Sequence, residues 1–324
     1  MKFAEVLARF ADVREEPDGY VGVCPAHRDR HPSLRITRDD THRVLLKCRA
    51  GCDTGDVITA ARLSWSDLFD VAGPGATVSS KRPEMVGPGP TAALAMYVDE
   101  TSCRLLDFRD QAAEDARSYV TGRFGLDLET AADLMLGVDD GESAPNFPYR
   151  SDVFTRYRRL TVPLHDFQGV ARGLQGRDLT GRCPGRWISL RNPEGQRWAP
   201  YGVLRGRGGH GVTLVTEGPG DGLTAVAAGY DAVLIRGASI AGNPALLEEL
   251  AAGLRGRQVI AAGDNDAAGH TFNRRLSKGL AAHGLPVLAL ALPNPGDDLT
   301  DWRAADPAAF PGALHQAVRS AWPC

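Results

Sequence analysis

The feature that most constrains the fold lies in the last part of the chain, from residue 210 onward. Four short apolar runs, VTLVT, AVLI, QVIAA and VLALAL, alternate there with alanine-rich stretches. Short apolar runs separated by helical stretches predict a parallel sheet with helices between its strands. We therefore expect residues 210–324 to form an α/β domain.

An acidic loop follows three of these runs. The loops read TEGPGD at 216–221, GDNDAAG at 263–269 and GDDLTD at 296–301. Because ligands bind at the carboxyl ends of parallel strands, these carboxylates should converge on one crevice. Neighbouring carboxylates repel one another unless a divalent cation lies between them, and Mg²⁺ prefers oxygen ligands. The pattern predicts metal-assisted phosphoryl transfer. The alternative is that Asp264 and Asp266 only cap the helix that follows.

Glycines in the first two loops fit the same purpose. Gly218 and Gly220 would let the backbone turn sharply after the first apolar run, and Gly269 would allow a close approach beside the paired aspartates.

Four candidate metal ligands lie close together near the N-terminus. They form two pairs, Cys24-Pro-Ala-His27 and Cys48-Arg-Ala-Gly-Cys52. Zinc takes four such ligands tetrahedrally, and ligands a few residues apart suit the tight turns that present them. The segment between the pairs, SLRITRDDTHRVLLKC, alternates like a β-hairpin that would bring the second pair to the first. We predict one structural zinc ion per chain; the alternative is two unrelated thiol pairs.

The text CPAHRDRHPSL followed by CRAGCDTGDVI resembles the zinc-binding domain of bacterial and phage DNA primases. Those domains read Cys-Pro-x-His, then a Pro-Ser pair, then a Cys pair followed by Gly-Asp-Val. This chain departs by placing three residues, not two, between its last two cysteines. The resemblance implies a zinc-ribbon-like β module that holds single-stranded template. Its candidate contacts are Arg28, Arg30, Arg35, Arg38 and Lys47.

Composition marks the domain boundaries. Residues 72–91 are rich in Gly, Pro, Ser and Thr, which predicts a flexible linker after a zinc-binding domain at 1–71. The alternative is an ordered surface loop. Helical periodicity follows from residue 92 to about 145. We expect a mixed α/β basic subdomain over residues 92–209, before the parallel-sheet domain at 210–324.

Charge is distributed unevenly, although the formal net charge is only -3. Residues 150–207 contain 12 arginines and 4 acidic residues, whereas residues 97–142 contain 4 arginines and 12 acidic residues. A local excess of basic residues is an electrostatic footprint for phosphates. The alternative is a solvated arginine-rich loop region.

The segment FTRYRRLTVPLHDFQGVARGLQGRDL reads as strand, turn and strand. With RWISLRNPEGQRWAPYGVL after it, the segment resembles the basic subdomain of the bacterial primase core. The residues on that family's pattern are Arg159, Pro163, Asp166, Gly169, Gly176 and Arg177. Arg186 stands where the family usually has Lys, and Asn192-Pro193 matches its Asn-Ser-Pro loosely. The resemblance implies contacts with template and nucleotide phosphates, and the candidates are Arg158, Arg159, Arg172, Arg177 and Arg186.

The Glu-Gly and Asp-x-Asp motifs resemble the Toprim domain, which primases, topoisomerases and some nucleases share. The resemblance implies a Rossmann-like parallel sheet, and a core catalytic set of Glu217, Asp264 and Asp266 that binds Mg²⁺ or Mn²⁺. Asp221, Asp298 and Asp301 are secondary candidates, because the third motif lacks the Lys often found before its Asp.

Toprim alone leaves three classes of function open: a primase, another nucleic-acid enzyme such as a nuclease or a topoisomerase-like protein, or a replication-associated binding protein with an idle site. A topoisomerase would need a tyrosine nucleophile in a large additional domain. A Toprim nuclease is usually joined to an ATPase, and the chain has no Gly-x-x-x-x-Gly-Lys-Ser/Thr. The complete acidic set disfavours an idle site. The order of zinc module, linker, basic segment and Toprim therefore favours a DNA primase.

The resemblance implies an RNA polymerase that makes short RNA primers on single-stranded DNA from ribonucleoside triphosphates by two-metal phosphoryl transfer. We expect any replicative helicase to be a separate protein, because the chain has no motor motif. The sequence ends soon after the Toprim pattern, which leaves no room for the helicase-binding domain of full-length bacterial primases and favours a phage or mobile-element origin.

No apolar run is long enough to span a membrane. The first sixteen residues, MKFAEVLARFADVREE, have acids where a signal peptide would have its apolar stretch. We interpret them as an amphipathic helix and expect a cytoplasmic protein.

Overall fold

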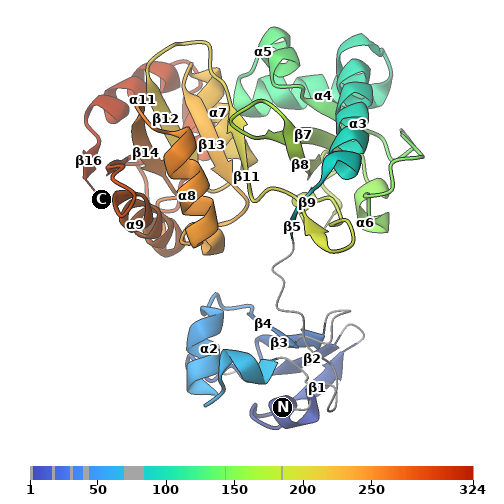
Figure 1. Ribbon diagram of the computed structural model, residues 1–324, viewed down its shortest axis with the longest axis vertical. Helices are drawn as coiled ribbons and strands as arrows, with labels where there is room; N and C mark the ends of the chain where they lie inside the picture. The colour runs from blue at the N-terminus through green and yellow to red at the C-terminus, as the bar shows by residue number, and fades with distance from the viewer. Residues whose placement is uncertain are drawn as a thin grey trace. The chain divides into compact units, whose positions relative to one another are not determined.

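The computed structural model describes residues 3–16, 19–29, 32–38, 44–68, 84–142, 144–183 and 185–323. The side chains of Trp65, Ser66 and Pro323 are outside this description. The chain divides into two compact units, an N-terminal unit at Met1–Arg82 and a C-terminal unit at Pro83–Cys324 (Figure 1).

The N-terminal unit is built on a four-stranded antiparallel sheet whose strands follow chain order. Its elements are α1 (Phe3–Leu7), β1 (Arg14–Glu16), β2 (Gly19–Gly22), β3 (Leu34–Arg38), β4 (Val44–Cys48), α2 (Thr54–Ala60) and the short helix η1 (Trp65–Leu68). Alternation in β3 and β4 buries Leu34, Ile36 and Leu46 on one face, against which α2 packs Val57. The hairpin predicted between the two ligand pairs is confirmed. The helix predicted over the first sixteen residues is wrong beyond Leu7, because residues 14–16 pair with β2 as a strand.

The C-terminal unit begins with β5 (Glu84–Met85) and a helical segment. Its helices are α3 (Pro88–Asp107), α4 (Gln111–Tyr119), the π-helix η2 (Val120–Phe124) and α5 (Leu128–Asp133). The expected helical region is therefore present, but the predicted linker extends too far. Residues 84–91 contain β5 and the start of α3, and residues 72–83 lie outside the described part of the chain.

A four-stranded antiparallel sheet follows the helices. Its strands are β6 (Gly137–Asp139), β7 (Arg159–His165), β8 (Ala171–Asp178) and β9 (Trp187–Ser189), and helix α6 (Asp152–Thr155) precedes β7. The predicted strand, turn and strand are β7 and β8, and Gly169 adopts a φ of 80° in the turn between them. Gly173, the next glycine along the chain, lies inside β8. A short parallel ladder joins β5 to β10 (Gln196–Arg197).

The second sheet has six strands in the order β11-β13-β12-β14-β15-β16. The four expected apolar runs form its parallel strands β12 (Val212–Thr216), β13 (Asp231–Ile235), β14 (Gln258–Ala262) and β15 (Val287–Ala289). Antiparallel edge strands flank them: β11 (Tyr201–Leu204) and β16 (Trp322–Pro323). Since β11 belongs to this sheet, the expected boundary at residue 210 falls too late in the chain.

Helices cover both faces of the six-stranded sheet (Figure 1). On one face α7 (Pro219–Ala227), α10 (Leu299–Ala305) and α11 (Phe310–Arg319) share a core with α4, η2 and the antiparallel sheet. On the other face α8 (Pro244–Gly253) and α9 (Ala267–Ala281) form a separate core. Because the first core runs through both sheets, the helices and strands of the C-terminal unit hold the carboxyl ends of β12 and β14 beside α4, η2 and β9.

Among the described residues, no helix has the length and apolar character needed to cross a membrane.

Candidate active site and metal centre

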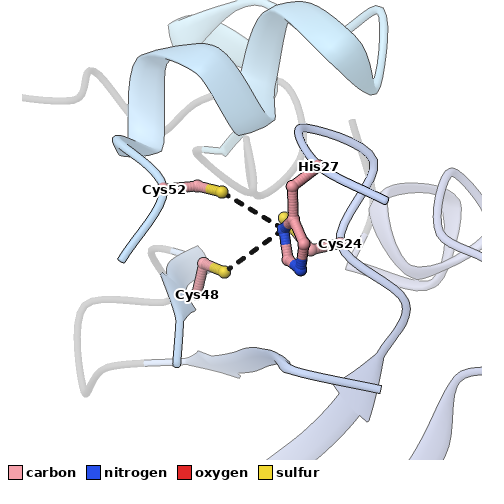
Figure 2. A group of neighbouring side chains, drawn as sticks. All are labelled: Cys24, His27, Cys48 and Cys52. Carbon is pink, nitrogen blue, oxygen red and sulfur yellow. Dashed lines mark hydrogen bonds between the residues drawn. The ribbon is translucent and has the colours of Figure 1, made fainter. Parts of the chain in front are cut away.

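The four predicted zinc ligands meet in the N-terminal unit. Cys24 and His27 lie in the turn after β2, Cys48 ends β4, and Cys52 lies in the loop before α2. One ligand atom from each residue lies within 4.8 Å of the others. His27 Nδ1 lies 3.2 Å from Cys52 Sγ and 3.9 Å from Cys48 Sγ. Dashed lines mark these two contacts in Figure 2. Three thiols and one imidazole at this spacing form the donor set of a structural zinc site.

Asp29 organises this site although it is not a ligand. Its Oδ2 accepts hydrogen bonds from Cys24 N at 2.8 Å and from Ser33 Oγ at 2.8 Å, and its Oδ1 lies 3.6 Å from His27 Nε2. A carboxylate at the far nitrogen of a histidine orients the ring, so that the other nitrogen faces the metal. The sequence reasoning missed this residue, which stands two positions after His27.

The thiol pKa values differ because the surroundings of the cysteines differ. Burial raises the pKa of Cys24 to about 12. Burial also opposes ionisation of Cys48, but hydrogen bonds from the Cys52 backbone and the Ser33 hydroxyl outweigh it and lower the pKa to about 7. Since zinc binds the thiolate, Cys48 is the sulfur most ready to take the ion at neutral pH.

The predicted carboxylates converge in the C-terminal unit. Glu217 follows β12, Asp264 follows β14 and Asp298 precedes α10; with Asp221 of α7 they line one cleft of about 330 Å³. The chain turns from β12 to β13 on one side and later to β14 on the other, so the cleft lies at the switch point of the sheet. The expectation that separate loops deliver these side chains to one crevice is met.

Hydrogen bonds fix the acidic side chains in different ways. Glu217 Oε1 accepts the Asp264 N–H at 3.2 Å. Asp221 Oδ1 accepts from Thr300 N at 3.1 Å and Thr300 Oγ1 at 2.9 Å, which ties α7 to α10. Asp266 Oδ1 caps α9 by accepting the Gly269 N–H at 2.8 Å. Asp266 therefore caps α9, as the alternative expected, and its charge also raises the pKa values of Glu217 and Asp264; Asp264 does not cap the helix and lines the cleft.

The structure requires a glycine at Gly269, as expected, but not at Gly218 or Gly220. A Cβ at Gly269 would collide with the backbone of Asp264, so this position needs glycine for a close approach. Gly218 has an extended φ of -165°, and Gly220 lies within α7 with ordinary contacts at its Cβ position. The backbone does bend at Glu217 and Gly218 between β12 and α7, but neither Gly218 nor Gly220 has a conformation that only glycine can adopt.

Burial and mutual repulsion raise the pKa values of the carboxyl groups in the cleft. Burial, followed by the neighbouring Asp264, raises the pKa of Glu217 to about 7. Burial and Asp298 raise the pKa of Asp264 to about 6, and the same two causes raise the pKa of Asp221 to about 8. Oxygen donors that resist ionisation because no cation balances them match a divalent cation site. Glu217, Asp264 and Asp298 are the residues that could hold such an ion.

The opposite wall of the cleft is basic and aromatic. Arg177 of β8 lies between two rings, 5.7 Å from the centroid of Tyr119 and 5.7 Å from that of Trp187. Arg186 lies on the same wall. Arg123, from the π-helix η2, also reaches the cleft, and its Nη2 forms an ion pair with Asp301 at 2.9 Å. A π-helix within a helix is a frequent feature of functional sites. The predicted Arg177 and Arg186 thus line the same cleft as the carboxylates.

Three other predicted arginines do not reach the cleft. Arg159 is fully buried, where its guanidinium donates to Phe154 O at 2.8 Å and Val153 O at 2.8 Å. Arg158 forms an ion pair with Asp115 at 2.7 Å. Arg172 binds Asp166 at 3.0 Å. Their position in the basic segment predicted contact with phosphates, whereas the structure uses all three to join neighbouring elements.

The predicted template contacts of the zinc module lie on its sheet and turn. Arg35 and Arg38 are on β3, Lys47 is on β4 and Arg28 is in the ligand-bearing turn. Arg30 lies outside the described residues.

Sequence reasoning missed Tyr119, Arg123, Phe124, Trp187 and Thr300 at the cleft. Trp187 could have been found as the neighbour of Arg186. Tyr119 and Arg123 are four residues apart in a helical segment, a spacing that places two side chains on one face. They were overlooked because their segment is acidic overall.

Comparisons with known proteins agree with this architecture. Residues 214–303 match the Toprim-like family model. No curated protein sequence matches the chain. The structure is similar to the zinc-binding and RNA polymerase domains of the Aquifex aeolicus primase, with 17% identity, a TM-score of 0.54 and coverage of 100% of this chain and 84% of that chain. It is also similar to the RNA polymerase domain of Mycobacterium tuberculosis primase DnaG, with 18% identity, a TM-score of 0.53 and coverage of 72% and 84%.

A third similar structure is the DnaG primase catalytic domain bound to single-stranded DNA, with 18% identity, a TM-score of 0.54 and coverage of 72% of this chain and 79% of that chain. The chain therefore has the fold of a zinc-binding domain followed by a primase-type RNA polymerase domain with a Toprim-like sheet. The fold class expected from the sequence is confirmed.

Proposed function

We propose that this protein is a DNA primase, which polymerises ribonucleotides into short primers on a single-stranded DNA template. The observation that carries the proposal is the cleft at the switch point of the six-stranded sheet. There Glu217, Asp264 and Asp298 line one cavity together with Arg177 and Arg186. Nucleotidyl transfer requires acidic side chains that bind a cation and, in the same cleft, positive side chains that bind phosphates.

The acidic wall would hold Mg²⁺ or Mn²⁺. When bound, such ions lower the pKa of an attacking hydroxyl and neutralise charge on a departing pyrophosphate. Glu217 and Asp264 are tied together through the Asp264 N–H, so both carboxylates are held on one side of the cleft. Asp221 fixes α10 through Thr300 and thereby sets the position of Asp298. Asp266 would act through its cap on α9, which fixes the loop that carries Asp264.

The basic wall would bind phosphates. Arg177 is held by ring contacts, and among the described residues its Nε has no hydrogen-bond partner and no carboxylate forms an ion pair with it. Its charge is therefore available to an anion in the cleft. Tyr119 and Trp187 present ring surfaces beside it, a combination that suits single-stranded nucleic acid or a nucleotide.

The N-terminal unit would hold the template during initiation. The zinc site would fix the sheet that carries Arg35 and Lys47, which occupy paired positions on adjacent strands. In this proposal single-stranded DNA and ribonucleoside triphosphates are the partners of the chain, and a separate replicative helicase supplies the unwound template.

The test is primer synthesis from labelled ribonucleoside triphosphates on varied single-stranded templates with Mg²⁺ or Mn²⁺. We compare the wild type with Asp264→Asn, and with Glu248→Gln as a matched acidic control that is exposed on α8. Loss of one metal-binding carboxylate should lower synthesis at least about a hundredfold, while the control retains it.

Two results would refute the proposal. One is the absence of any ribonucleotide product from the wild type on every template. The other is equal product from the wild type and Asp264→Asn. Metal-dependent cleavage of the template in place of synthesis would favour the nuclease alternative.

A further inference from the structure

A second cavity lies directly beside the acidic cleft. It has a volume of about 410 Å³ and opens between the carboxyl ends of β14 and β15. This volume falls within the range of roughly 300–1,000 Å³ that is typical of small-molecule sites. Neither the family resemblance nor the metal site accounts for it.

The walls of this cavity combine apolar and aromatic surface with a few polar groups. Ala289, Leu290 and Leu292 provide the apolar part, and Trp322 of β16 closes one side. Trp322 pairs with Ala289 in the sheet, yet 52% of its surface is exposed. An edge strand thus holds a large aromatic ring at the cavity with half of its surface free for contact.

The polar groups come from α9. Asn273 is buried, and its Oδ1 accepts the Gly263 N–H at 2.9 Å, which fixes the orientation of the amide. Its Nδ2 has no hydrogen-bond partner in the described part of the chain, and the residue lines the cavity. His270 and Arg274 stand on the same helix at the rim. The cavity therefore offers one oriented amide donor above an apolar surface, with a cation at its edge.

The cavity also shares a wall with the proposed catalytic cleft. Asp264 lines both cavities, and Gly263 immediately before it lines the second. A molecule that occupies the second cavity lies next to a carboxylate that would hold the catalytic cation. A ligand with a flat apolar part and an anionic end could fill the cavity and reach that cation.

We propose that this second cavity binds the base and sugar of a nucleotide whose phosphates extend toward the cation held at Asp264. The inference rests on the proposed function, because that function supplies nucleotides as substrates. The indole of Trp322 gives the base a stacking surface, and Asn273 gives it a hydrogen-bond donor. Arg274 lies where it can balance phosphate charge at the rim. The site would give the chain affinity for a nucleotide before any base pairing with template.

The experiment measures binding of two probes to the full-length protein by calorimetry in saturating Mg²⁺ without template. The probes are ATP and inorganic tripolyphosphate, which lacks base and sugar. The variants are Trp322→Ala, which removes the stacking surface, and Ala291→Phe, which fills the cavity from an exposed position that lines it. Phe108→Ala is the matched control, because Phe108 is 50% exposed and lies at the end of α3.

We expect the wild type to bind ATP at least tenfold more tightly than tripolyphosphate. Each cavity variant should weaken ATP binding about tenfold and leave tripolyphosphate binding within twofold, whereas the control changes neither. A wild type that binds both probes equally, or that binds no ATP, would overturn the inference. So would ATP affinity that stays within twofold in both variants, or an equal loss for both probes.

Primer synthesis is measured separately, so the two failures can be told apart. Loss of synthesis in Asp264→Asn together with unchanged ATP binding in both cavity variants would leave the primase proposal standing and remove this one. A wild type that makes no primer, yet binds ATP more tightly than tripolyphosphate as expected, would refute the primase proposal and leave the nucleotide-binding cavity standing.

Discussion

The two candidate metal sites of this protein are assembled in opposite ways. The Cys/His site draws its four ligands from Cys24 to Cys52, on a turn, a strand end and a loop of one small sheet. The acidic cleft draws its carboxylates from Glu217 to Asp298 and its basic wall from Arg123 to Arg186, across two sheets. The first site is local in sequence, whereas the second depends on the fold of the whole C-terminal unit.

The difference teaches what each metal does for stability. The N-terminal unit has a small core, and a core of this size rarely supplies more than about 3–5 kcal/mol. The free energy of zinc binding is therefore part of its folding free energy. The described part of the C-terminal unit has three hydrophobic cores, and the acidic residues of the cleft belong to none of them. Its fold should stand without a cation, and the cation should act on charge within the cleft.

Removal of zinc should produce the largest effect. Structural zinc sites contribute about 10–16 kcal/mol in zinc-finger peptides, which exceeds what this small core can replace. A chelator, or the variant Cys48→Ser, should abolish amide-exchange protection over residues 3–68 and leave that over residues 84–323 unchanged. Metal analysis should give one zinc per wild-type chain, and the exposed Cys103→Ser should retain it. If zinc-free wild type kept full amide-exchange protection in the N-terminal unit, the claim that this unit depends on its metal for folding would be wrong.

Arg159→Ala should have the next largest effect. Its buried guanidinium donates to two backbone carbonyl groups at 2.8 Å. Hydrogen bonds from Cys183 and Thr180 lower the pKa of Asp178, and the charge of Arg159 lowers it further. Truncation leaves those groups unpaired, and we expect a loss of about 3–5 kcal/mol in the free energy of unfolding. Chemical denaturation measures it. Stability within 1 kcal/mol of the wild type, with weaker DNA binding, would restore the sequence-based assignment of Arg159 to phosphate contact.

The pH dependence of stability should reveal the acidic cleft. Without a divalent cation, the folded-state pKa values of Glu217 (about 7) and Asp264 (about 6) exceed those of ordinary carboxyl groups. The folded chain therefore binds more protons than the unfolded chain between about pH 4 and pH 8, so its stability falls as pH rises through this window. With discounting for solvent screening, we expect a loss on the order of 2 kcal/mol.

Mg²⁺ should reverse this loss, most strongly at high pH where the carboxylates are ionised. Urea denaturation from pH 5 to pH 8 with and without Mg²⁺ measures both effects. Glu217→Gln should flatten the metal-free profile, and Glu248→Gln on α8 should follow the wild type. A metal-free profile that rises with pH would show that the cleft is already balanced by charges of the protein.

Arg177→Ala should have the smallest effect. The side chain is partly exposed in the cleft, so stability should change little, but one phosphate contact should be lost. The slope of log affinity for single-stranded DNA against log salt should fall by about 1. Arg255→Ala, at an exposed position after α8, should keep the wild-type slope. Equal slopes for all three proteins would remove Arg177 from the phosphate-binding wall.

Much of the fold could be predicted because its signals are local. The apolar runs at β12 to β15 needed only their own residues to indicate buried parallel strands. The edge strands β11 and β16 gave no such signal. Before Tyr201 the sequence contains two prolines and several arginines, and Trp322 is followed by Pro323. These strands are therefore defined only by their pairing with the sheet.

The acidic half of the cleft was predictable, whereas the basic half was predictable only in part. Carboxylates after parallel strands must meet at one edge, so Glu217 and Asp264 followed from topology. Arginines carry no such positional rule, since their side chains are long and pair wherever a carboxylate or carbonyl is near. Arg159 on β7 and Arg177 on β8 belong to the same antiparallel strand pair. Arg159 is nevertheless fully buried, whereas Arg177 lines the cleft. Only tertiary packing separates their roles.

The central claim is that the chemistry belongs to the C-terminal unit and that the zinc unit assists the start of synthesis. The most direct measurement compares the full chain with a fragment of residues 83–324, which keeps the ladder between β5 and β10. Both proteins are assayed for extension of a preformed RNA primer and for initiation on bare single-stranded DNA. The account predicts that the fragment retains extension within a fewfold and loses initiation by at least about a hundredfold. A fragment that initiates as well as the full chain, or that cannot extend although it is folded, would contradict it.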